Sequence, residues 1–248
     1  MTPDVSVQEG RVLRARLEPF DSYWQAPEDV EAGYASFAAY YRANYLPHLP
    51  EDRASRILVV SCGPGYLVDV LLQAGYRDVT GIDSDSAKIE YATRRQLPCR
   101  VARAFDYLEG LVEAYDVIIP EQELNHLTLD ESVEFLRLVH SALRPGGRVV
   151  LYAVNGANPF VGSESLAQNI DHFYTVTEYS LGQILQLGGF TRVKPFPLQL
   201  YVFYRNPFNY LGLFVTTLLE VSLRIVFRLY GKKVSILSKK IGAVGFRE

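Results

Sequence analysis

The sequence predicts an α/β fold with a doubly wound, mostly parallel sheet, an N-terminal helix and a C-terminal helical tail. The first observation is an apolar run, residues 57–60, that leads directly into a turn containing Gly63 and Gly65. The second is another apolar run, residues 79–82, which ends at Asp83. The third is the alternation of β-prone and helix-period segments, which is typical of parallel strands joined by crossover helices.

The individual elements follow from periodicity and from the residues that end each run. Tyrosine, phenylalanine and alanine at helical spacing predict a helix over residues 28–46, which Pro47 and Pro50 end. Short apolar or β-prone runs predict five strands, at residues 57–60, 79–82, 100–104, 115–119 and 148–154. Helices are expected between them, at residues 67–74, 86–95 and 130–143.

The second half of the chain completes the expected fold. Asp130 is the expected N-cap of the helix that Pro145 and two glycines stop. We expect a loop, a helix and further strands at residues 155–172, 177–187 and 190–204. The chain is therefore divided into an N-terminal helical lead-in, an α/β domain and a basic amphipathic helical tail, at residues 1–50, 51–204 and 205–248.

Composition excludes several classes of function. A net charge of −3 over 248 residues gives no sign of a nucleic-acid partner. The two cysteines, Cys62 and Cys99, form no C-x-x-C pattern, and the four histidines are scattered, so neither a disulfide framework nor a metal site is expected. The first residues are polar and lack an apolar signal core, which predicts a cytoplasmic protein.

The tail differs from the rest of the chain in charge. Residues 205–248 contain eight basic and two acidic side chains, a net charge of +6, so the remainder carries −9. Apolar residues dominate residues 211–230, but Glu220, Arg224 and Arg228 interrupt them at four-residue spacing. Such a segment can lie on the inner face of a membrane, build a homodimer or pack on its own domain.

The glycine turn and Asp83 indicate the type of ligand. Glycines allow a ligand to approach the backbone closely, and the start of a helix offers unpaired N–H groups. An acid at the end of the second strand is where a doubly wound fold binds ribose hydroxyls. The alternative is a strand–helix junction in which Gly63 and Gly65 serve only packing.

Several motifs in this order resemble the class I S-adenosylmethionine-dependent methyltransferases, which have a Rossmann-like fold. The resemblance covers about residues 46–203, and its pieces are V-S-C-G-P-G at 60–65, G-I-D at 81–83, Y-D-V-I at 115–118, N-H-L at 125–127 and L-R-P-G-G at 143–147. A narrower likeness, to bacterial methyltransferases of polysaccharide and O-antigen biosynthesis, rests on the N-G-A-N-P loop, His172 and T-E-Y-S-L at 155–159, 172 and 177–181.

Three departures from the family pattern leave alternatives open. Ser61 stands where the family usually has an acid, Leu67 where it has a third glycine, and Asn125 where it often has glutamate. The loss of the acid is compatible with a catalytically inactive relative that serves as a partner or scaffold subunit. A nicotinamide-dependent oxidoreductase is the other alternative, against which Leu67 and the L-x-P-G-G motif argue.

The resemblance implies a set of cofactor-binding residues for S-adenosylmethionine: Ser61, Gly63, Gly65, Asp83, Phe105 and Asp106. Phe105 and Asp106 would face the adenine, although Asp106 could equally cap a helix.

Position along the expected sheet also gives candidate catalytic and substrate-binding residues. His126 follows the fourth strand and His172 the fifth, so both lie at the ligand side, where a histidine suits proton transfer near neutral pH. Either histidine could instead be structural. Glu121, Glu123 and Asn155 are the expected substrate-binding residues. Tyr40, Tyr41 and Tyr45 would stack on a sugar or simply pack their helix.

Together these features predict an S-adenosylmethionine-dependent methyltransferase that O-methylates a sugar hydroxyl in the synthesis of a bacterial surface polysaccharide. A small acceptor other than a sugar, and an inactive partner subunit, remain as alternatives.

Overall fold

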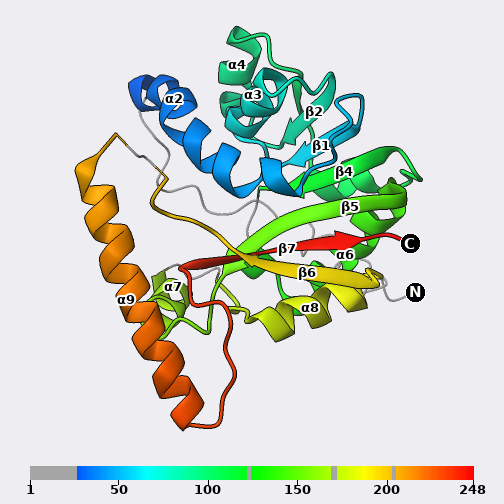
Figure 1. The fold of residues 1–248 in the computed structure, drawn as a ribbon. Coiled ribbons are helices and arrows are strands. Elements are labelled where there is room, and N and C mark those ends of the chain that lie inside the picture. Colours follow the sequence, from blue (N-terminus) through cyan, green and yellow to red (C-terminus); the bar gives the residue numbers. More distant parts are fainter. Residues whose placement is uncertain (1–26, 122–123, 169–171, 203–204) are drawn as a thin grey trace, which may run out of the picture.

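The structure, a computed structural model, describes residues 27–121, 124–168, 172–202 and 205–248 (Figure 1). Its centre is a seven-stranded sheet in the order β3-β2-β1-β4-β5-β7-β6. The strands are β1 (Arg56–Val60), β2 (Asp78–Asp83), β3 (Cys99–Val101), β4 (Tyr115–Pro120), β5 (Leu143–Val154), β6 (Arg192–Pro197) and β7 (Lys240–Phe246). The first five strands pair in parallel and β7 pairs antiparallel with both neighbours, which confirms the predicted fold class.

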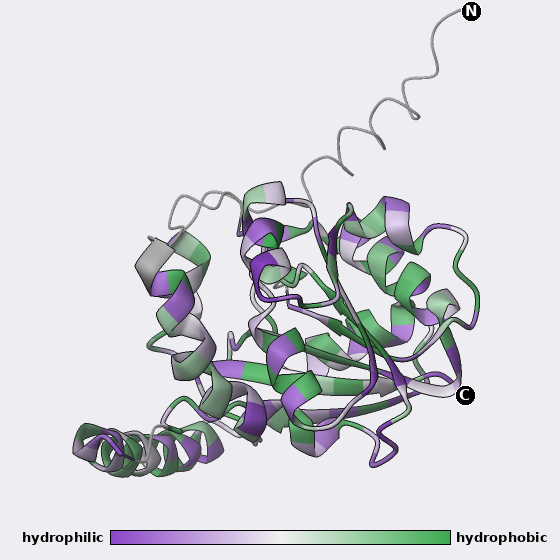
Figure 2. Ribbon diagram, turned by 90° about the horizontal axis from the view of Figure 1, so that it is seen from above, coloured by the Kyte–Doolittle hydropathy of each residue, from purple (hydrophilic) through white to green (hydrophobic). Residues whose placement is uncertain are grey.

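Helices cover both faces of the sheet, as a doubly wound fold requires. One face packs against α2 (Pro27–Asn44), α3 (Tyr66–Gln73) and α4 (Ser86–Arg94), and the other against α5 (Ala104–Leu108), α6 (Leu129–Ala142) and α8 (Glu178–Leu187). Two short turns, η1 (Leu46–His48) and η2 (Leu124–His126), and two further helices, α7 (Gly162–Gln168) and α9 (Pro207–Leu229), complete the chain. The apolar strands lie between the two helical layers, while α9 stands to one side (Figures 1 and 2).

The N-cap of α6 differs from the prediction. Thr128, not Asp130, accepts a hydrogen bond from the Glu131 N–H, and the Glu131 carboxylate accepts one from the Thr128 N–H at 2.8 Å. This reciprocal pair is a capping box, whereas Asp130 lies exposed in the first turn. The helix ends at Ala142, one residue earlier than expected.

Strand β5 is longer than predicted because the P-G-G turn belongs to it. The strand starts at Leu143, and Gly147 packs so closely that an added Cβ would lie 2.8 Å from the Arg144 carbonyl oxygen and 3.1 Å from that of Asp116. Residues 155–172 are not only a loop, since they contain α7. Strand β3 is shorter than expected and ends at Val101, after which α5 begins at Ala104.

The largest difference from the prediction concerns β7, the sixth strand in the spatial order of the sheet. Strand β7 comes from the segment predicted as a helical tail, and it pairs along its whole length with β5 and along most of it with β6. The ring of Phe196 occupies the position where a side chain at Gly242 would lie, so the two neighbours fit only with glycine there. The sheet therefore continues beyond residue 204 and is completed by residues 240–246.

The capping box gives a test of the helix start. We expect Thr128→Ala to lower the free energy of unfolding by about 1 kcal/mol. The Glu131 N–H loses the Thr128 hydroxyl as its hydrogen-bond acceptor, and the capping box is broken. Asp130→Ala is the matched control and should cost about 0.5 kcal/mol or less, the contribution of an exposed acid near a helix N-terminus. Urea unfolding of both variants measures the difference, and a larger loss for Asp130→Ala would contradict the observed cap.

Candidate functional site

The loop after β1 has an unusual backbone that opens space beside it. Ser61, Gly63 and Gly65 all have positive φ, of 56°, 54° and 88°. A Cβ added at Gly65 would lie 2.9 Å from Leu97, so this glycine is required for packing. At Gly63 an added Cβ would meet nothing within 4 Å, so the backbone there borders open space in which a ligand can approach.

Asp83 fixes this loop from the neighbouring strand. One carboxylate oxygen accepts a hydrogen bond from the Gly63 N–H at 2.8 Å, and the other accepts one from the Asp85 N–H at 2.9 Å. The side chain is 6% exposed, at the end of β2. Each carboxylate oxygen can accept more than one hydrogen bond, so Asp83 can hold the loop and still bind hydroxyl groups of a ligand.

Helix α2 covers the same loop. The Tyr34 hydroxyl donates a hydrogen bond to the Pro64 carbonyl oxygen at 2.6 Å, and the Tyr66 hydroxyl donates one to that of Val30 at 3.0 Å. The Tyr66 ring also occupies the space where a side chain at Gly33 would lie. Helix α2, which belongs to the predicted N-terminal lead-in, is therefore part of the site.

The two other predicted cofactor residues lie in α5 and have different environments. The Phe105 ring is 2% exposed and packs edge-on against Phe135 at 5.8 Å between centroids, so it belongs to the core and does not face a ligand. Asp106 is exposed in the first turn of α5, whose N-cap is Arg103. Asp106 is thus not the helix cap, and its carboxylate points out of the core.

The strand order reverses between β1 and β4, and a cavity of about 350 Å³ lies at the carboxyl end of β4. The Glu121 N–H donates a hydrogen bond to the Val60 carbonyl oxygen at 2.8 Å, which places Glu121 next to the start of the glycine loop. In doubly wound folds this reversal is where ligands bind. The residues lining the cavity are Phe37, Tyr40, Tyr41, Tyr45, Glu121, Tyr152, Leu198, Gln199, Leu200, Lys239 and Lys240.

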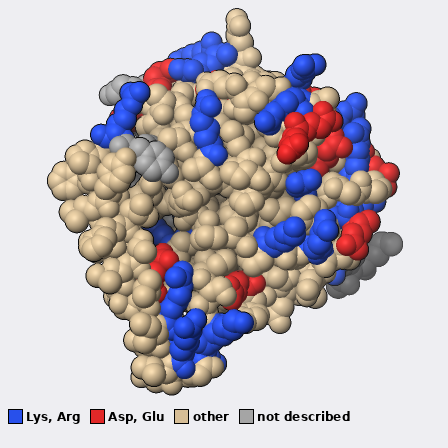
Figure 3. Space-filling view, in the orientation of Figure 1, with Lys and Arg blue, Asp and Glu red and all other residues tan. Residues whose placement is uncertain are grey.

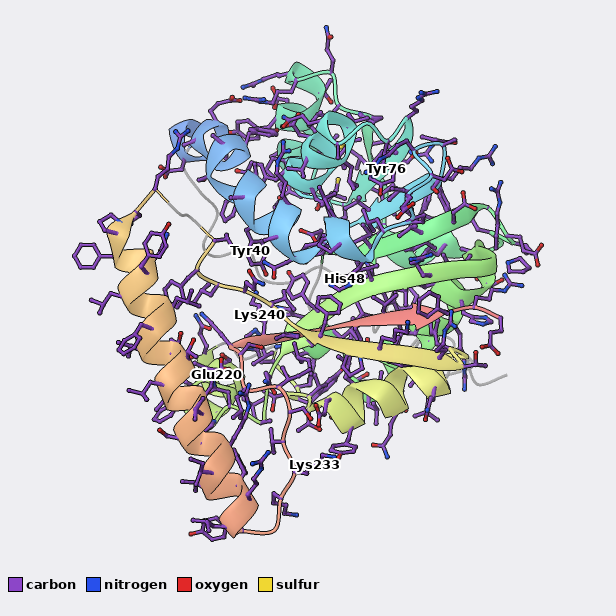
Figure 4. The ribbon with its side chains drawn as sticks, in the orientation of Figure 1. Tyr40, His48, Tyr76, Glu220, Lys233 and Lys240 are labelled. Carbon is purple, nitrogen blue, oxygen red and sulfur yellow. The ribbon has the colours of Figure 1, made fainter. Side chains whose placement is uncertain are left out.

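The cavity walls are aromatic, with few polar groups. The rings of Tyr45 and Tyr152 pack edge to face with their centroids 6.3 Å apart, and the Lys240 ammonium lies 4.7 Å from the Tyr152 ring centre. Tyr40 on α2 and Lys240 at the start of β7 mark its two sides in Figure 4. Sequence patterns pointed to Tyr40, Tyr41 and Tyr45 but missed Tyr152 and Lys240, which come from β5 and from the tail.

Glu121 is the titratable group that stands out in this cavity. Burial raises the pKa of its carboxyl, and the hydroxyl of Tyr41 together with the charge of Lys240 opposes that rise only in part. Its Oε1 atom and the Tyr45 hydroxyl are buried without a hydrogen-bond partner among the described residues. A buried polar atom without a partner costs stability unless a ligand satisfies it. Glu123, the other predicted acid here, lies outside the described residues.

The two predicted histidines lie together in the structure. The rings of His126 and His172 meet edge to face, with their centroids 4.6 Å apart. Nδ1 of His172 contacts the carbonyl oxygen of Ser165 in α7. A carbonyl can only accept, so Nδ1 carries the proton and Nε2 is the basic nitrogen. His172 lines a cavity of about 140 Å³ that shares Lys239 and Lys240 with the aromatic cavity.

Asn155 has a structural role instead of the expected substrate contact. It is fully buried, its amide donates to the carbonyl oxygens of Ile236 and Ser238, and its oxygen accepts from the Ala157 N–H. These bonds use its hydrogen-bonding groups to anchor the segment before β7. Asn125, one of the departures from the family pattern, is 1% exposed and both of its amide atoms lack a partner among the described residues.

No group of three or more histidine, cysteine or acidic side chains is arranged to hold a metal ion within the ranges that the structure describes.

Comparison with known sequences connects this arrangement to methyl transfer. Residues 57–147 match the family described as "Methyltransferase domain". The "Ubiquinone biosynthesis O-methyltransferase" of Pseudomonas entomophila is 28% identical over 120 residues, 46% of this chain and 50% of the relative. The "tRNA U34 carboxymethyltransferase" of Idiomarina loihiensis is 30% identical over 116 residues, 44% of this chain and 35% of the relative. The chain therefore spans about half the length of the first relative and about a third of the length of the second.

Solved structures extend the likeness over almost the whole chain. A "SAM dependent methyltransferase" from Archaeoglobus fulgidus superposes with a TM-score of 0.59 at 16% identity, covering 88% of this chain and 94% of that one. Phosphoethanolamine N-methyltransferase 2 of Haemonchus contortus, with phosphomonomethylethanolamine and S-adenosylhomocysteine, gives a TM-score of 0.64 at 14% identity, covering 95% of this chain and 60% of that one. These likenesses establish the fold.

Two glycines with positive φ, Gly63 and Gly146, test the glycine loop. Gly63→Ala and Gly146→Ala both place a Cβ in open space at positive φ, so each should cost about 1 kcal/mol of stability. Only the Cβ at residue 63 enters the space beside the loop, so only Gly63→Ala should weaken S-adenosylmethionine binding, by about tenfold or more, a loss comparable to that of one charge-assisted hydrogen bond. Calorimetry measures both affinities, and equal affinities would place the cofactor elsewhere.

Proposed function

We propose that this chain, whose residues 57–147 form a methyltransferase domain with S-adenosylmethionine as its cofactor, transfers the methyl group to a hydroxyl of a small, ring-bearing acceptor held in the aromatic cavity. The observation that carries the proposal is the position of that cavity. It opens at the carboxyl end of β4, and its Glu121 is hydrogen-bonded to the residue that precedes the glycine loop.

The residues of the glycine loop fit the cofactor. Gly63 leaves open space beside its backbone, and the carboxylate of Asp83 is held where ribose hydroxyls can donate to it. Asp106 is exposed in α5, at the position in the sequence where the resemblance implies an adenine contact. Ser61 takes the place of the usual acid, so we assign its position to the cofactor's amino-acid end with a hydroxyl in place of a charge. The bound cofactor supplies an electrophilic methyl group on a sulfonium.

The cavity suits an acceptor with a flat or cyclic body and at least one hydroxyl. Four tyrosines and one phenylalanine provide ring faces and edges, and a volume of about 350 Å³ is within the range of small-molecule sites. Glu121, Gln199 and Lys240 offer polar contacts at fixed positions. Such walls hold the acceptor in one orientation and exclude water, which is the main contribution that the protein makes to a displacement reaction.

Transfer to a hydroxyl needs a group that accepts its proton. The acceptor oxygen forms a bond to the methyl carbon, the sulfur–carbon bond breaks, and the proton goes to the protein. Glu121 is the first candidate because it lines the cavity and its raised pKa makes it a stronger base than an exposed carboxylate. His172, with Nε2 as its basic nitrogen, is the second candidate for the proton acceptor, and the ring of His126 packs against the ring of His172.

Two observations point to different acceptor classes. The motifs shared with polysaccharide and O-antigen methyltransferases favour a sugar hydroxyl, and tyrosine rings are common sugar platforms. The relatives named ubiquinone biosynthesis O-methyltransferase favour a phenolic hydroxyl, which aromatic walls also accommodate. We rank the sugar first and keep the phenol as the second candidate.

The two acceptor classes separate in one assay. Methyl transfer from labelled S-adenosylmethionine is measured against a panel of glycans and nucleotide sugars, and in parallel against catechols and hydroquinols. Product from the first panel supports the sugar, and product from the second supports the phenol. Cofactor binding without product from either panel would support the inactive partner subunit, and no cofactor binding would contradict the proposed function altogether.

Glu121→Gln tests the proton acceptor. Only the carboxylate form accepts a proton, so the wild-type rate should rise with pH until it passes the raised pKa of Glu121 and then level off. The variant should lose this rise and turn over about 100- to 10,000-fold more slowly. Glu90→Gln, an exposed position on α4, is the matched control and should keep the wild-type profile.

A stability measurement distinguishes a variant that has lost only its proton acceptor from one that has lost its folded structure. Because the pKa of Glu121 is raised in the folded state, its ionisation above that pKa opposes folding, so Glu121→Gln should be at least as stable as wild type at pH 8. If Glu121→Gln keeps its activity while His172→Gln loses it, the histidine is the base and Glu121 only binds the acceptor.

A further inference from the structure

Helix α9 is exposed along its whole length, although it is one of the most apolar segments of the chain. None of its 23 residues is buried. It is long and apolar enough, by length and composition, to cross a membrane. Large apolar side chains point into solvent along it, including Phe208, Leu211, Phe214, Leu218, Ile225 and Leu229, with exposed fractions between 55% and 82%.

The polar side of α9 faces the domain. Gly212 packs against the ring of Tyr201, and Thr216 and Glu220 line a groove between the helix and the domain. Three leucines of the helix, Leu213, Leu219 and Leu223, line the same groove. Glu220 points from the helix toward the rest of the molecule in Figure 4, and it pairs with Arg224 at 3.3 Å. A helix on the surface of a globular protein normally turns its apolar face toward the core. Most large apolar side chains of α9 instead point away from the domain. This outward side, called the outer face below, has no partner among the described residues.

Basic side chains flank this outer face. Arg205 precedes the helix, Arg228 lies in its last turn, and Lys232 and Lys233 follow it, all four exposed. Figure 3 shows Lys and Arg gathered at the lower end of α9, where Lys233 lies in Figure 4. Glu220, the single acid of this helix, is on the side toward the domain.

We propose that the outer face of α9 docks on an anionic lipid bilayer, with the helix lying in the plane of the interface. The apolar side chains would enter the boundary between headgroups and acyl chains, and the flanking lysines and arginines would bind the anionic headgroups. A second copy of the chain is a poorer occupant, because it would bring another tail of the same net charge, +6, against the first.

The topology of the sheet argues for docking and against a membrane span. Strands β6 and β7, which precede and follow α9, are antiparallel neighbours in one sheet. If α9 crossed the bilayer, residues 230–239 would have to cross back with Lys232 and Lys233 and without a helix or strand. Unpaired backbone and charged side chains are costly in the hydrocarbon region. A helix in the interface plane avoids both costs.

The groove between α9 and the domain adjoins the proposed reaction site. It has a volume of about 510 Å³ and shares Leu198, Gln199, Leu200 and Lys239 with the aromatic cavity. Figure 3 shows the surface hollowed between α9 and the domain, with basic side chains within the hollow. Because α9 borders this groove with its inner side, docking through the outer face would hold the bilayer on the opposite side of the helix from the groove.

The test is cosedimentation of the full chain with vesicles of phosphatidylcholine alone and of phosphatidylcholine with 30% phosphatidylglycerol. Binding should be strong to the anionic vesicles and weak to the neutral ones, and it should fall as salt rises. Phe214→Glu with Leu218→Glu should lower partitioning at least about 100-fold, because two apolar anchors become acids. The matched control, Val112→Glu with Leu187→Glu, changes exposed apolar residues elsewhere and should bind as wild type does.

Charge is tested in the same way. Lys232→Gln with Lys233→Gln should lower binding to anionic vesicles by roughly tenfold or more, and Arg77→Gln with Arg137→Gln, two exposed charges away from α9, should not. Unchanged S-adenosylmethionine affinity shows that each variant is folded, whatever the acceptor proves to be. Failure of the wild type to bind anionic vesicles would overturn the proposal, as would a dimer in light scattering that Phe214→Glu with Leu218→Glu converts to a monomer.

Discussion

The hydrogen bond between Asp83 and the Gly63 N–H is the interaction on which the site depends. Three residues with positive φ lie within five positions; glycine adopts this conformation freely but Ser61 does not, and such strain persists only where neighbours impose it. Asp83 imposes it from β2, Tyr34 imposes it from α2, and the Glu121 N–H holds the last residue of β1 just before the loop. The open space at Gly63 exists because these three contacts fix the backbone around it.

The same contacts join the two halves of the proposed active site. Glu121 uses its main chain to pair with β1 and its side chain to line the aromatic cavity. A short rigid connection of this kind keeps cofactor and acceptor in a fixed relation, which is what a displacement reaction needs most. The cost is a buried carboxyl with a raised pKa and an oxygen without a partner, a form of local instability that is typical of functional sites.

The C-terminal segment has two roles that its composition does not separate. Residues 240–246 form the strand between β5 and β6 and so join β6 to the rest of the sheet. Arg247 donates hydrogen bonds to main-chain carbonyls around the end of α6, including that of Ser141 at 2.9 Å. Lys240 at the start of β7 reaches the acceptor cavity. Residues 207–229, inserted between β6 and β7, form the exposed helix. The segment thus stabilises the domain at one end and presents an apolar surface at the other.

The sequence by itself determined the parallel sheet, the glycine loop and Asp83 at the end of the second strand, because each depends on local patterns. It also placed His126 and His172 at the same end of the sheet, from the strand that each follows, but their ring contact is visible only in the structure. Tertiary structure decided the rest. Phe105 faces the core and Asn155 anchors the tail, since burial depends on what packs above a residue and not on its position in the chain. Strand β7 contains two glycines and an alanine among its seven residues, which weaken its strand propensity, and it is held in place because β5 and β6 offer it hydrogen bonds on both edges. The outward apolar face of α9 was likewise invisible in the sequence, because helical periodicity defines two faces but not which of them turns toward the domain.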